Sequence, residues 1–435
     1  MKVFKFGGAS VKDAAGVKNV AGIVKQYQHE NLCIVISAMG KITNALEELV
    51  KAYVKDANSN PNKFNDSKKE IFEKIKDYHY SIIHDLFEPG PGRDAALLKV
   101  NVFFLELQNR FEKMPSANYD LVYDQIVCVG ELVSTTIVSE YFNAIGLTNT
   151  WFDARRLIRT DSTYREGKVD WKISEQQVSK TLIPFYIGSL EKKIAITQGF
   201  IGGTSIDLTT TLGREGSDYT AAILSYLLDA RDMTIWKDVP GVLNADPRIH
   251  PDAVKLNKIS FHEAIELTYY GATVIHPKTI KPLQNKGIPL YVNSFIEPNK
   301  KGTVIQPSED FDNKIPSYIY KKNQVLLSII PRDFSFVDEQ NLRDIFDLFA
   351  QFNLHINLMQ NSAMSFSVAC DNIEEKLPHL IKQLQVNYKV KYNENCELLT
   401  VRHYTEKILT KATEGREILV TQKSRSTARF VFRSK

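Results

Sequence analysis

A lysine and two glycines near the amino terminus form the first candidate site for chemistry. Lys5 ends a short apolar run, and Gly7, Gly8 and Ser10 follow it at the expected start of a helix. Glycine amides and a helix amino terminus attract anions, and an ammonium group adds a positive charge, so the pattern suits a phosphate. The sequence has neither G-x-x-x-x-G-K-[ST] nor G-x-G-x-x-G. Because a Gly-Gly turn after a strand is more often an ordinary loop, this motif alone is weak.

A second polar segment spans residues 209–218 and precedes an expected helix over 218–228. It combines three threonines, two glycines, Arg214, Ser217 and Asp218. Ser217 or Asp218 could serve only as the helix cap. Capping does not require three threonines or an arginine beside two glycines, so we favour a ligand site. Arg214 is suited to binding a carboxylate through two parallel hydrogen bonds.

Three shorter polar segments are further candidates. Ser37 and Thr43 follow one apolar run, and Lys237 and Asp238 end another. Glu131 opens an amphipathic segment at 130–143, where it is expected to interact with the helix dipole. Asp238 with the following Val-Pro-Gly fits an ordinary turn equally well. Four of the five candidate segments lie where buried strands end, which is the edge at which open α/β sheets bind ligands.

The elements that must position these residues alternate between strands and helices. Residues 1–40 are typical of strand, helix and strand, with a continuous apolar run at 32–37. Residues 44–115 are charged and helical in period, which predicts an inserted lobe of about three helices. Further strands are expected at 151–153, 194–197, 233–237 and 289–293. The fold class is therefore α/β, with a mainly parallel sheet sandwiched by helices.

The carboxyl-terminal part has a different pattern. A looser polar linker is expected from about residue 302, followed by a strand at 324–330, a helix at 338–353, strands near 356–359 and 366–370, and a helix at 372–385. This β-α-β-β-α order predicts a ferredoxin-like α+β region. The remaining residues are rich in strands and too few for a complete second copy.

Composition excludes several classes of protein. Of 435 residues, 43% are hydrophobic and 24% are charged, which is ordinary for a globular protein. The net charge is +4, so we expect neither a nucleic-acid nor a membrane partner. Four scattered cysteines and nine unclustered histidines argue against a metal site made by protein ligands. We expect no secretory signal. We also expect no stretch that approaches the ~18–20 apolar residues needed to span a bilayer, so we predict a cytoplasmic protein.

Together the segments resemble those of the aspartate kinases, which belong to the amino acid kinase family. The resemblance rests on KFGGAS, GELVST, TQGFIGG, TTTLGREGSDYTAA, WKDVPGVLNADPR and YGATVIHPKT. It implies an amino acid kinase catalytic domain at 1–305 and an ACT-type regulatory region at 306–435, in which a second ACT unit is abridged. No fused homoserine dehydrogenase is expected.

The resemblance implies transfer of the ATP γ-phosphate to the β-carboxylate of L-aspartate, with Mg²⁺, giving 4-phospho-L-aspartate. This is the first step in making lysine, threonine and methionine from aspartate. A carboxylate with an ordinary pKa near ~4 is already ionised at neutral pH and needs no general base. Two alternatives remain open: a catalytically inactive amino-acid sensor, and a kinase of another small acid such as glutamate or N-acetylglutamate.

The resemblance also implies roles for individual residues. Lys5 and Asp218 would be catalytic, Glu131 would bind the substrate ammonium and Arg214 its α-carboxylate. The residues implied in ATP binding are Lys5, Gly7, Gly8, Ser10, Ser37, Lys237, Asp238, Leu243 and Arg248. Those implied in aspartate binding are Thr43, Glu131, Phe200, Arg214, Ser217 and Asp218. Lys237, Leu243 and Thr273 depart from residues common in the family, which leaves their effect on nucleotide binding open.

The regulatory region resembles its relatives less closely. An amino-acid effector would contact Ser335, Phe336, Val337 and Asn357. Asn357 stands where lysine-sensitive relatives tend to have aspartate, and an amide binds an ammonium less well than a carboxylate does. The effector is therefore open. Regulatory domains of this kind pair across subunits, so we expect a homodimer or a larger homo-oligomer.

Overall fold

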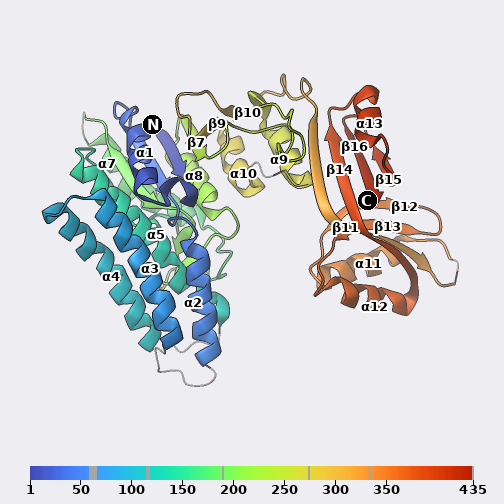
Figure 1. The fold of residues 1–435 in the computed structure, drawn as a ribbon, viewed down its shortest axis with the longest axis horizontal. Coiled ribbons are helices and arrows are strands. Elements are labelled where there is room, and N and C mark those ends of the chain that lie inside the picture. Colours follow the sequence, from blue (N-terminus) through green and yellow to red (C-terminus); the bar gives the residue numbers. More distant parts are fainter. Residues whose placement is uncertain (58–65, 114–117, 189–190, 273–274, 334, 434–435) are drawn as a thin grey trace. The chain divides into compact units, whose positions relative to one another are not determined.

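The computed structural model describes residues 1–57, 66–113, 118–188, 191–272, 275–333 and 335–433. The chain forms two compact units (Figure 1). The first contains Met1–Val242, Asn257–Phe261 and Ile275–Ser308, and the second contains Leu243–Leu256, His262–Val274 and Glu309–Lys435. Two segments that precede residue 305 therefore pack with the carboxyl-terminal part of the chain.

An eight-stranded sheet organises the first unit, in the order β3-β4-β2-β1-β7-β9-β10-β8. Its strands are β1 (Lys2–Phe6), β2 (Leu32–Ile36), β3 (Thr150–Phe152), β4 (Ile194–Gln198), β7 (Asp232–Lys237), β8 (Lys258–Ser260), β9 (Leu290–Ser294) and β10 (Thr303–Gln306). Pairing is parallel from β3 to β9 and between β10 and β8, and antiparallel between β9 and β10. The mainly parallel sheet is confirmed. The linker expected from residue 302 is wrong at its start, because β10 belongs to the sheet.

Helices cover both faces of this sheet, as the continuous apolar strands predict. Phe4 and Phe6 of β1 point to one face, where they join a core that includes Ile34 and Ile36 of β2. Helix α1 (Ala14–Lys25) contributes to that core. Helix α8 (Gly216–Leu227) packs on β1, β2 and β7, and α10 (Pro277–Lys286) packs on α8. Helices α6 (Ala154–Leu157) and α7 (Trp171–Ile187) complete the unit.

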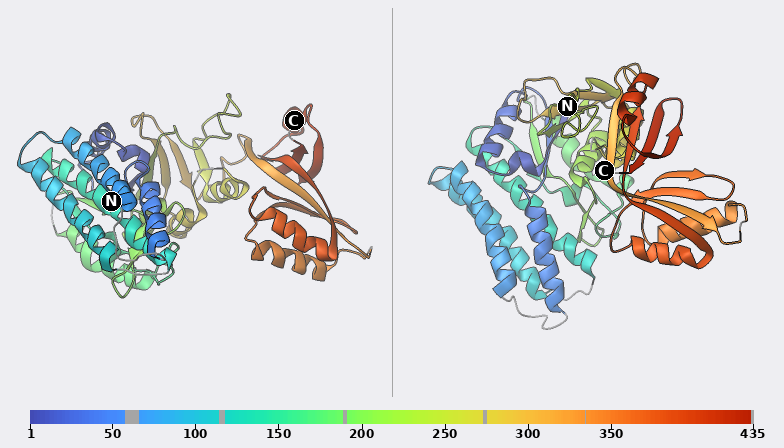
Figure 2. Two further views of the ribbon diagram at one scale, coloured as in Figure 1. Left: turned by 60° about the horizontal axis from the view of Figure 1, so that its bottom comes forward. Right: turned by 45° about the vertical axis from the view of Figure 1, so that its right-hand side comes forward.

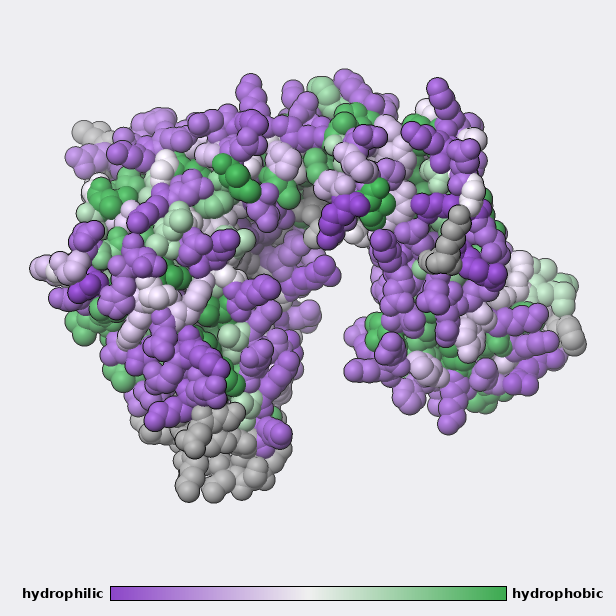
Figure 3. Space-filling model, viewed as in Figure 1, coloured by the Kyte–Doolittle hydropathy of each residue, from purple (hydrophilic) through white to green (hydrophobic). Residues whose placement is uncertain are grey.

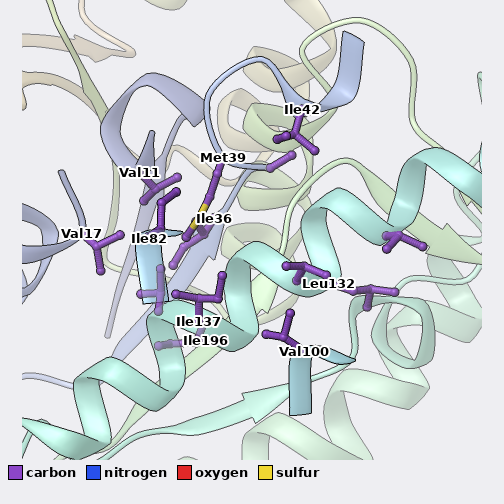
Figure 4. Close-up of a cluster of buried hydrophobic side chains, with 14 of the residues drawn as sticks. Val11, Val17, Ile36, Met39, Ile42, Ile82, Val100, Leu132, Ile137 and Ile196 are labelled. Carbon is purple, nitrogen blue, oxygen red and sulfur yellow. The ribbon is translucent and has the colours of Figure 1, made fainter. Parts of the chain in front are cut away.

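Four long helices lie side by side in the first unit (Figures 1 and 2). They are α2 (Ile42–Ala57), α3 (Asp66–Leu86), α4 (Pro91–Lys113) and α5 (Tyr119–Ala144). The three inserted helices match the prediction, but α5 begins eleven residues before the predicted start at 130, at a cap made by Asn118. Figure 4 shows how the bundle joins the sheet through Val11, Val17, Ile36, Met39, Ile42, Ile82, Val100, Leu132, Ile137 and Ile196.

Helix α5 corrects one prediction from the sequence. In the described part of the chain it is long and apolar enough, by length and composition alone, to cross a membrane. The expectation that no segment approaches that size is therefore wrong. In the folded chain, 94% of its most apolar window is buried inside the protein. On the face drawn in Figure 3, hydrophilic side chains predominate and hydrophobic ones form only small groups.

A six-stranded antiparallel sheet organises the second unit, in the order β12-β13-β11-β14-β16-β15. Its elements are β11 (Ser317–Pro331), α11 (Glu339–Gln351), β12 (Ile356–Asn361), β13 (Phe366–Asp371), α12 (Leu377–Asn387), β14 (Tyr388–Arg402), α13 (Glu406–Thr413), β15 (Ile418–Lys423) and β16 (Thr427–Arg433). The β-α-β-β-α order is confirmed, and the region is consistent with an ACT-like domain. Beyond β14, the described residues add a single helix and two strands.

Helix α9 (Phe261–Tyr270) is fixed to this second sheet by a buried ion pair. The Arg402 guanidinium at the end of β14 contacts Glu263 at 2.6 Å and Glu266 at 2.6 Å. Residues 243–256 are attached to the second unit by hydrogen bonds. The Asn244 side-chain amide donates to the Pro316 carbonyl, and the Asn244 backbone carbonyl accepts from the Tyr318 amide. These contacts explain why both segments belong to the second unit.

Candidate active site

Segments that carry residues singled out in the sequence follow four neighbouring strands of the first sheet. The carboxyl ends of these strands form one edge of the sheet. In the register of the sheet, Phe6 of β1 lies level with Ile36 of β2 and Trp236 of β7, and Ile36 lies level with Gln198 of β4. The segments that follow these strands therefore leave the sheet at the same level. The carboxyl ends of parallel strands are where such sheets bind ligands.

A cavity of about 860 Å³ opens at this edge. It is lined by residues from β1, β7, α2, α5 and α8 and from the segments between the strands and helices. The lining residues are Lys5, Gly8, Ser37, Ala38, Gly40, Thr43, Asp120, Tyr123, Glu131, Thr163, Tyr164, Arg165, Glu166, Phe200, Thr211, Gly213, Arg214, Glu215, Gly216, Ser217, Asp218 and Lys237. Most of the side chains singled out in the sequence thus share one space.

Asp218 lies between two lysines in this cavity. Its Oδ1 is 2.6 Å from Lys5 Nζ, and its Oδ2 is 4.0 Å from Lys237 Nζ. The Asp218 side chain is 4% exposed and that of Lys5 is 12% exposed, so this contact is largely removed from water. Two ammonium groups and one carboxylate leave a net positive charge at the ends of β1 and β7. That charge is suited to an anionic ligand such as a phosphate.

The start of α8 places Ser217 and Asp218 at the cavity. Glu215 precedes the helix in the left-handed region, at φ 53°, and makes no side-chain cap. Ser217 and Asp218 lie within the first turn, so the interpretation of either residue as the helix cap is wrong. Gly216 is required by close packing, because a Cβ there would lie 2.6 Å from the Phe200 ring. The Glu215 carboxylate instead accepts a hydrogen bond from the His276 amide, at 2.9 Å.

Glu131 is a buried carboxyl group near the middle of α5. It is 2% exposed, and no described residue provides a hydrogen-bond partner for its Oε2. Burial raises its pKa to about 8, although hydrogen bonds from its own backbone amide and that of Ala38 oppose the shift. The prediction that Glu131 lies at a helix start is wrong, so the helix dipole cannot stabilise it. A buried carboxyl group with one unpartnered oxygen, facing a cavity, is suited to a cationic group of a ligand.

Side chains of α5 also hold the threonine segment in place. Residues Thr209–Thr211 form β6, which pairs with β5 (Ile201–Gly203). The Gln125 amide group accepts from the Thr209 amide at 3.1 Å and donates to its carbonyl at 2.7 Å. Asp124 accepts from the amide and the hydroxyl of Thr211, at 3.0 and 2.7 Å. The consecutive threonines are therefore buried and fixed, with Thr211 at the cavity wall.

Phe200 reaches the cavity in a conformation that is uncommon for a bulky residue. Its φ is 72°, in the left-handed region. The Phe200 amide donates to the Thr220 hydroxyl at 2.9 Å, and its carbonyl accepts from the Leu212 amide at 2.8 Å. These two bonds fix the turn between β4 and β5 to α8 and to the segment that precedes α8.

Comparison with known proteins places the fold in a family. The sequence model of the amino acid kinase family matches residues 1–294, which is more than half of the chain. The chain belongs to the amino acid kinase family. The matched region includes the whole cavity described above.

Within this family, the chain is similar to aspartokinases. The lysine-sensitive aspartokinase 3 of Escherichia coli strain K12 is 31% identical over 374 residues, which are 85% of this chain and 78% of that protein. The chloroplastic aspartokinase 2 of Arabidopsis thaliana is 32% identical over 375 residues, which are 85% of this chain and 66% of that protein.

Solved structures of an aspartokinase extend the similarity to the second unit. The crystal structure of E. coli aspartokinase III with lysine and aspartate has a TM-score of 0.81 at 26% identity, and the match covers 99% of this chain and 95% of that one. The structure of the same protein with aspartate and ADP has a TM-score of 0.78 at 27% identity, over 99% and 96%. The fold is thus shared over nearly the full length.

The cavity of this amino acid kinase gathers ten of the residues singled out in the sequence. They are Lys5, Gly8, Ser37, Thr43, Glu131, Phe200, Arg214, Ser217, Asp218 and Lys237. Gly7, Ser10 and Asp238 lie beside these residues along the chain but do not line the cavity. Ser10 is buried, and Asp238 is exposed directly after β7. Their roles stay predictions.

Two residues implied in nucleotide binding belong to the second unit. Leu243 forms an isolated bridge with Lys255, and Arg248 is paired with Asp246 at 2.7 Å on an exposed turn. Nucleotide binding by Leu243 and Arg248 stays a prediction. Thr273 lies outside the described residues.

The residues implied in effector binding are only partly accessible. Ser335 and Phe336 are exposed, and Val337 is buried. Asn357 is 6% exposed, and its amide group is fully engaged within the unit. It donates to Gln324 and Asp371 and accepts from Lys321 Nζ at 2.7 Å. A ligand at Asn357 would have to compete with Lys321, and effector binding there stays a prediction.

The sequence did not single out Tyr123 and Arg165, which line the cavity, or Asp124, which holds Arg165 and Thr211 by hydrogen bonds. A signal existed for Asp124, because Asp124 and Gln125 interrupt an otherwise apolar run from Leu121 to Val129. Polar side chains in such a run are expected to hold hydrogen-bond partners when buried. No comparable pattern marks Arg165, whose position depends on the fold of the loop that carries it.

Proposed function

We propose that this chain is an aspartate kinase that transfers the γ-phosphate of ATP to the β-carboxylate of L-aspartate. One observation carries the proposal. A single cavity combines a lysine-rich region at the ends of β1 and β7 with a buried carboxyl group on α5, one oxygen of which is unpartnered in the described structure, and an exposed arginine before α8. These features are complementary to a polyphosphate on one side and to an amino acid on the other.

The phosphate side needs positioning and positive charge more than acid–base chemistry. Transfer of a phosphoryl group is catalysed mainly by holding the reactants in line and stabilising the charge of the moving group. Lys5 and Lys237 supply that charge, and Asp218 fixes the Lys5 ammonium. A carboxylate acceptor is already ionised, and no histidine lines the cavity in the described part of the chain.

The amino-acid side combines both charges that an α-amino acid requires. Glu131 offers its carboxyl oxygen Oε2, which has no partner among the described residues, to the ammonium. Arg214 is exposed at the cavity, and no hydrogen bond occupies its guanidinium among the residues described. Its planar donors match a carboxylate. An N-acetylated substrate lacks the ammonium, so it would leave Glu131 unpaired.

Mg²⁺ is compatible with the acidic residues at this edge of the sheet. No cluster of three candidate metal ligands occurs among the described residues. Mg²⁺ commonly takes only one or two protein carboxylates and completes its shell with water and substrate phosphates. The exposed carboxylate of Asp238, directly after β7, and that of Asp218 are suited to this arrangement. When bound, the ion neutralises charge on the phosphate oxygens.

We further propose that the ACT-like region binds an amino-acid effector and supports a homodimer or larger assembly. The lysine-sensitive aspartokinase of E. coli supports the first part. We keep the catalytic domain at 1–305 and the regulatory region at 306–435, with its last strands as an abridged ACT unit. The four cysteines are unpaired and buried, which supports a reducing, cytoplasmic location.

Trapping of the product tests the proposed function. The chain is incubated with ATP, Mg²⁺ and hydroxylamine, which converts an acyl phosphate into a hydroxamate. We expect hydroxamate with L-aspartate, and little with L-glutamate or N-acetyl-L-glutamate. Faster reaction with either of the latter would establish a different acceptor. Calorimetric binding of amino acids without any turnover would instead favour an inactive sensor.

A further inference from the structure

Arg165 places a second guanidinium in the cavity, on the wall formed by α2 and α5. The guanidinium carbon lies 4.3 Å from the centre of the Tyr123 ring and 5.7 Å from that of Tyr119. Its nitrogens lie 3.7 Å from carboxylate oxygens of Glu47 and Asp120, which is beyond normal hydrogen-bond length. The side chain is 41% exposed.

The backbone of Arg165 is fixed from behind by Asp124. Arg165 has a φ of 65°, in the left-handed region, and its amide donates to Asp124 Oδ2 at 2.9 Å. Asp124 is fully buried and also holds Thr211 through two hydrogen bonds. One carboxylate thus joins the arginine loop to the threonine strand. Such a constraint on an uncommon backbone conformation is typical of functional positions.

The loop of Arg165 runs directly beside the segment that carries Arg214. The Gly167 amide donates to the Thr211 carbonyl at 2.9 Å. A Cβ placed on Gly213, the residue before Arg214, would lie 3.3 Å from the Arg165 carbonyl oxygen. Two arginines therefore reach the cavity from adjacent segments.

The guanidinium of Arg165 retains its hydrogen-bonding capacity. The guanidinium lies over the Tyr123 ring, which restricts its position. The two nearby carboxylates partly offset its positive charge without forming hydrogen bonds. In the described residues, no side-chain or backbone acceptor lies within hydrogen-bond distance of it. A preorganised planar fork of donors is suited to a carboxylate ligand.

We propose that Arg165 acts with Arg214 to bind the α-carboxylate of the amino-acid substrate, and so helps to select it. This inference rests on the proposed function. The position of Arg165 favours the amino acid over the nucleotide, because its neighbours on α2 and α5 share a wall with Thr43 and Glu131. The lysines suited to phosphate lie instead on β1 and β7.

Steady-state kinetics of the full chain test the proposal. Arg165→Gln is expected to raise KM for L-aspartate roughly tenfold or more, as for a lost charged hydrogen bond. KM for ATP is expected to stay within about twofold. Arg165→Lys keeps the positive charge but loses the planar pair of donors, so its KM for L-aspartate should lie between those of the parent chain and Arg165→Gln. Lys168→Gln removes a cation from the same loop outside the cavity and serves as the matched control.

A substrate analogue separates binding from a structural role. Aspartate whose α-carboxylate is replaced by a carboxamide should show nearly the same KM with the parent chain and with Arg165→Gln. Equal KM values for L-aspartate in both proteins, or a rise in KM for ATP instead, would overturn the proposal. A similar rise in KM for L-aspartate and for its α-carboxamide would mean that the substitution acts through the structure, which would also overturn the proposal.

Calorimetric titration with L-aspartate makes the same comparison without turnover. If the parent chain binds aspartate but forms no hydroxamate, the proposed kinase activity fails, and the comparison at Arg165 is still decided by the two dissociation constants. If Arg165→Gln does not fold, Arg165→Lys provides the same comparison. If the parent chain does not bind aspartate at all, both proposals are overturned.

Discussion

Asp218 and Glu131 are two buried carboxyl groups in the same cavity, with opposite surroundings. Asp218 contacts the ammonium groups of Lys5 and Lys237. No cation lies beside Glu131 in the part of the chain that the structure describes, and burial raises the pKa of Glu131 to about 8. Environments that differ in this way commonly separate the roles of two acids. We therefore expect Asp218 to organise the lysines and Glu131 to bind a cation that arrives with the substrate.

The raised pKa of Glu131 predicts how aspartate binding depends on pH. Below pH 8 the free carboxyl holds a proton, and pairing with an ammonium requires its loss. Binding therefore releases a proton, so KM for L-aspartate should fall as pH rises from about 6 toward 8, and then level. Glu131→Gln should raise KM and remove this dependence. The same slope in both proteins would contradict the role assigned to Glu131.

Many residues that line the cavity could be singled out from the sequence, whereas their electrostatic states could not. Lys5, Arg214 and Asp218 stand in segments whose composition departs from what turns and caps require. The partnership of Lys5 and Asp218 joins residues 213 positions apart in the chain. The pKa of Glu131 depends on burial by several elements, which no local pattern reports.

At the scale of single elements, close packing at the strand ends decides where glycine is required. Gly8 follows β1, and its carbonyl accepts from the Gly40 amide at 3.0 Å. A Cβ on Gly8 would lie 2.6 Å from the Ala38 carbonyl oxygen and 2.8 Å from that of Gly40. Both are backbone atoms, so the loops after β1 and β2 would have to separate.

Two glycine substitutions should therefore have opposite effects. Gly8→Ala is expected to destabilise the first unit by about 1–3 kcal/mol, since overpacking forces the backbone to shift. Gly22→Ala lies inside α1 with nothing within 4 Å of the new Cβ and should stabilise it by roughly 0.5–1 kcal/mol. Thermal unfolding measures both. Equal stability of Gly8→Ala and the parent chain would show that the two loops are not packed as described.

The extent of α5 shows why one element was predicted only in part. Its second half was recognised and its first half was not. Residues 122–139 are all buried, and a helix surrounded by protein has no polar face to give a period. Asn118 caps the helix through a hydrogen bond to the Leu121 amide at 3.1 Å. A single capping asparagine in a polar segment is too weak a signal to identify the start of the helix.

At the scale of the whole molecule, the end of the family match does not coincide with the boundary between the two packed units. Helix α9 lies within the family match at residues 1–294, yet it packs with the carboxyl-terminal sheet. Burial alone would raise the pKa of Glu263, but hydrogen bonds from His403 and Arg402 outweigh it and lower the pKa. The ion pair therefore attaches a segment of the kinase sequence to the second unit.

Disruption of this ion pair should loosen α9 selectively. Arg402→Met leaves Glu263 buried with one ionic partner fewer, and we expect a loss of about 3–5 kcal/mol. Arg433→Ala breaks an exposed pair with Glu417 in the same unit and should cost less than about 1 kcal/mol. Amide hydrogen exchange of α9 should accelerate only in the first variant. Unchanged exchange in Arg402→Met would show that the ion pair does not hold the helix.

The pairing of distant segments was beyond the reach of sequence analysis. The order of strands and helices predicted the two sheets, because each has its own period and composition. The attachment of residues 243–256 and 262–274 depends on contacts such as that of Asn244 with Pro316, 72 residues away. Contacts of this kind leave no local mark in the sequence.

Hydroxamate formation by Lys5→Ala tests the central claim most directly. The Lys5 ammonium lies in the cavity, 2.6 Å from the Asp218 carboxylate. Its removal should lower the rate with ATP and L-aspartate by roughly 10²–10³-fold or more, with the fold retained by circular dichroism. A folded Lys5→Ala protein with near-normal activity would contradict the account.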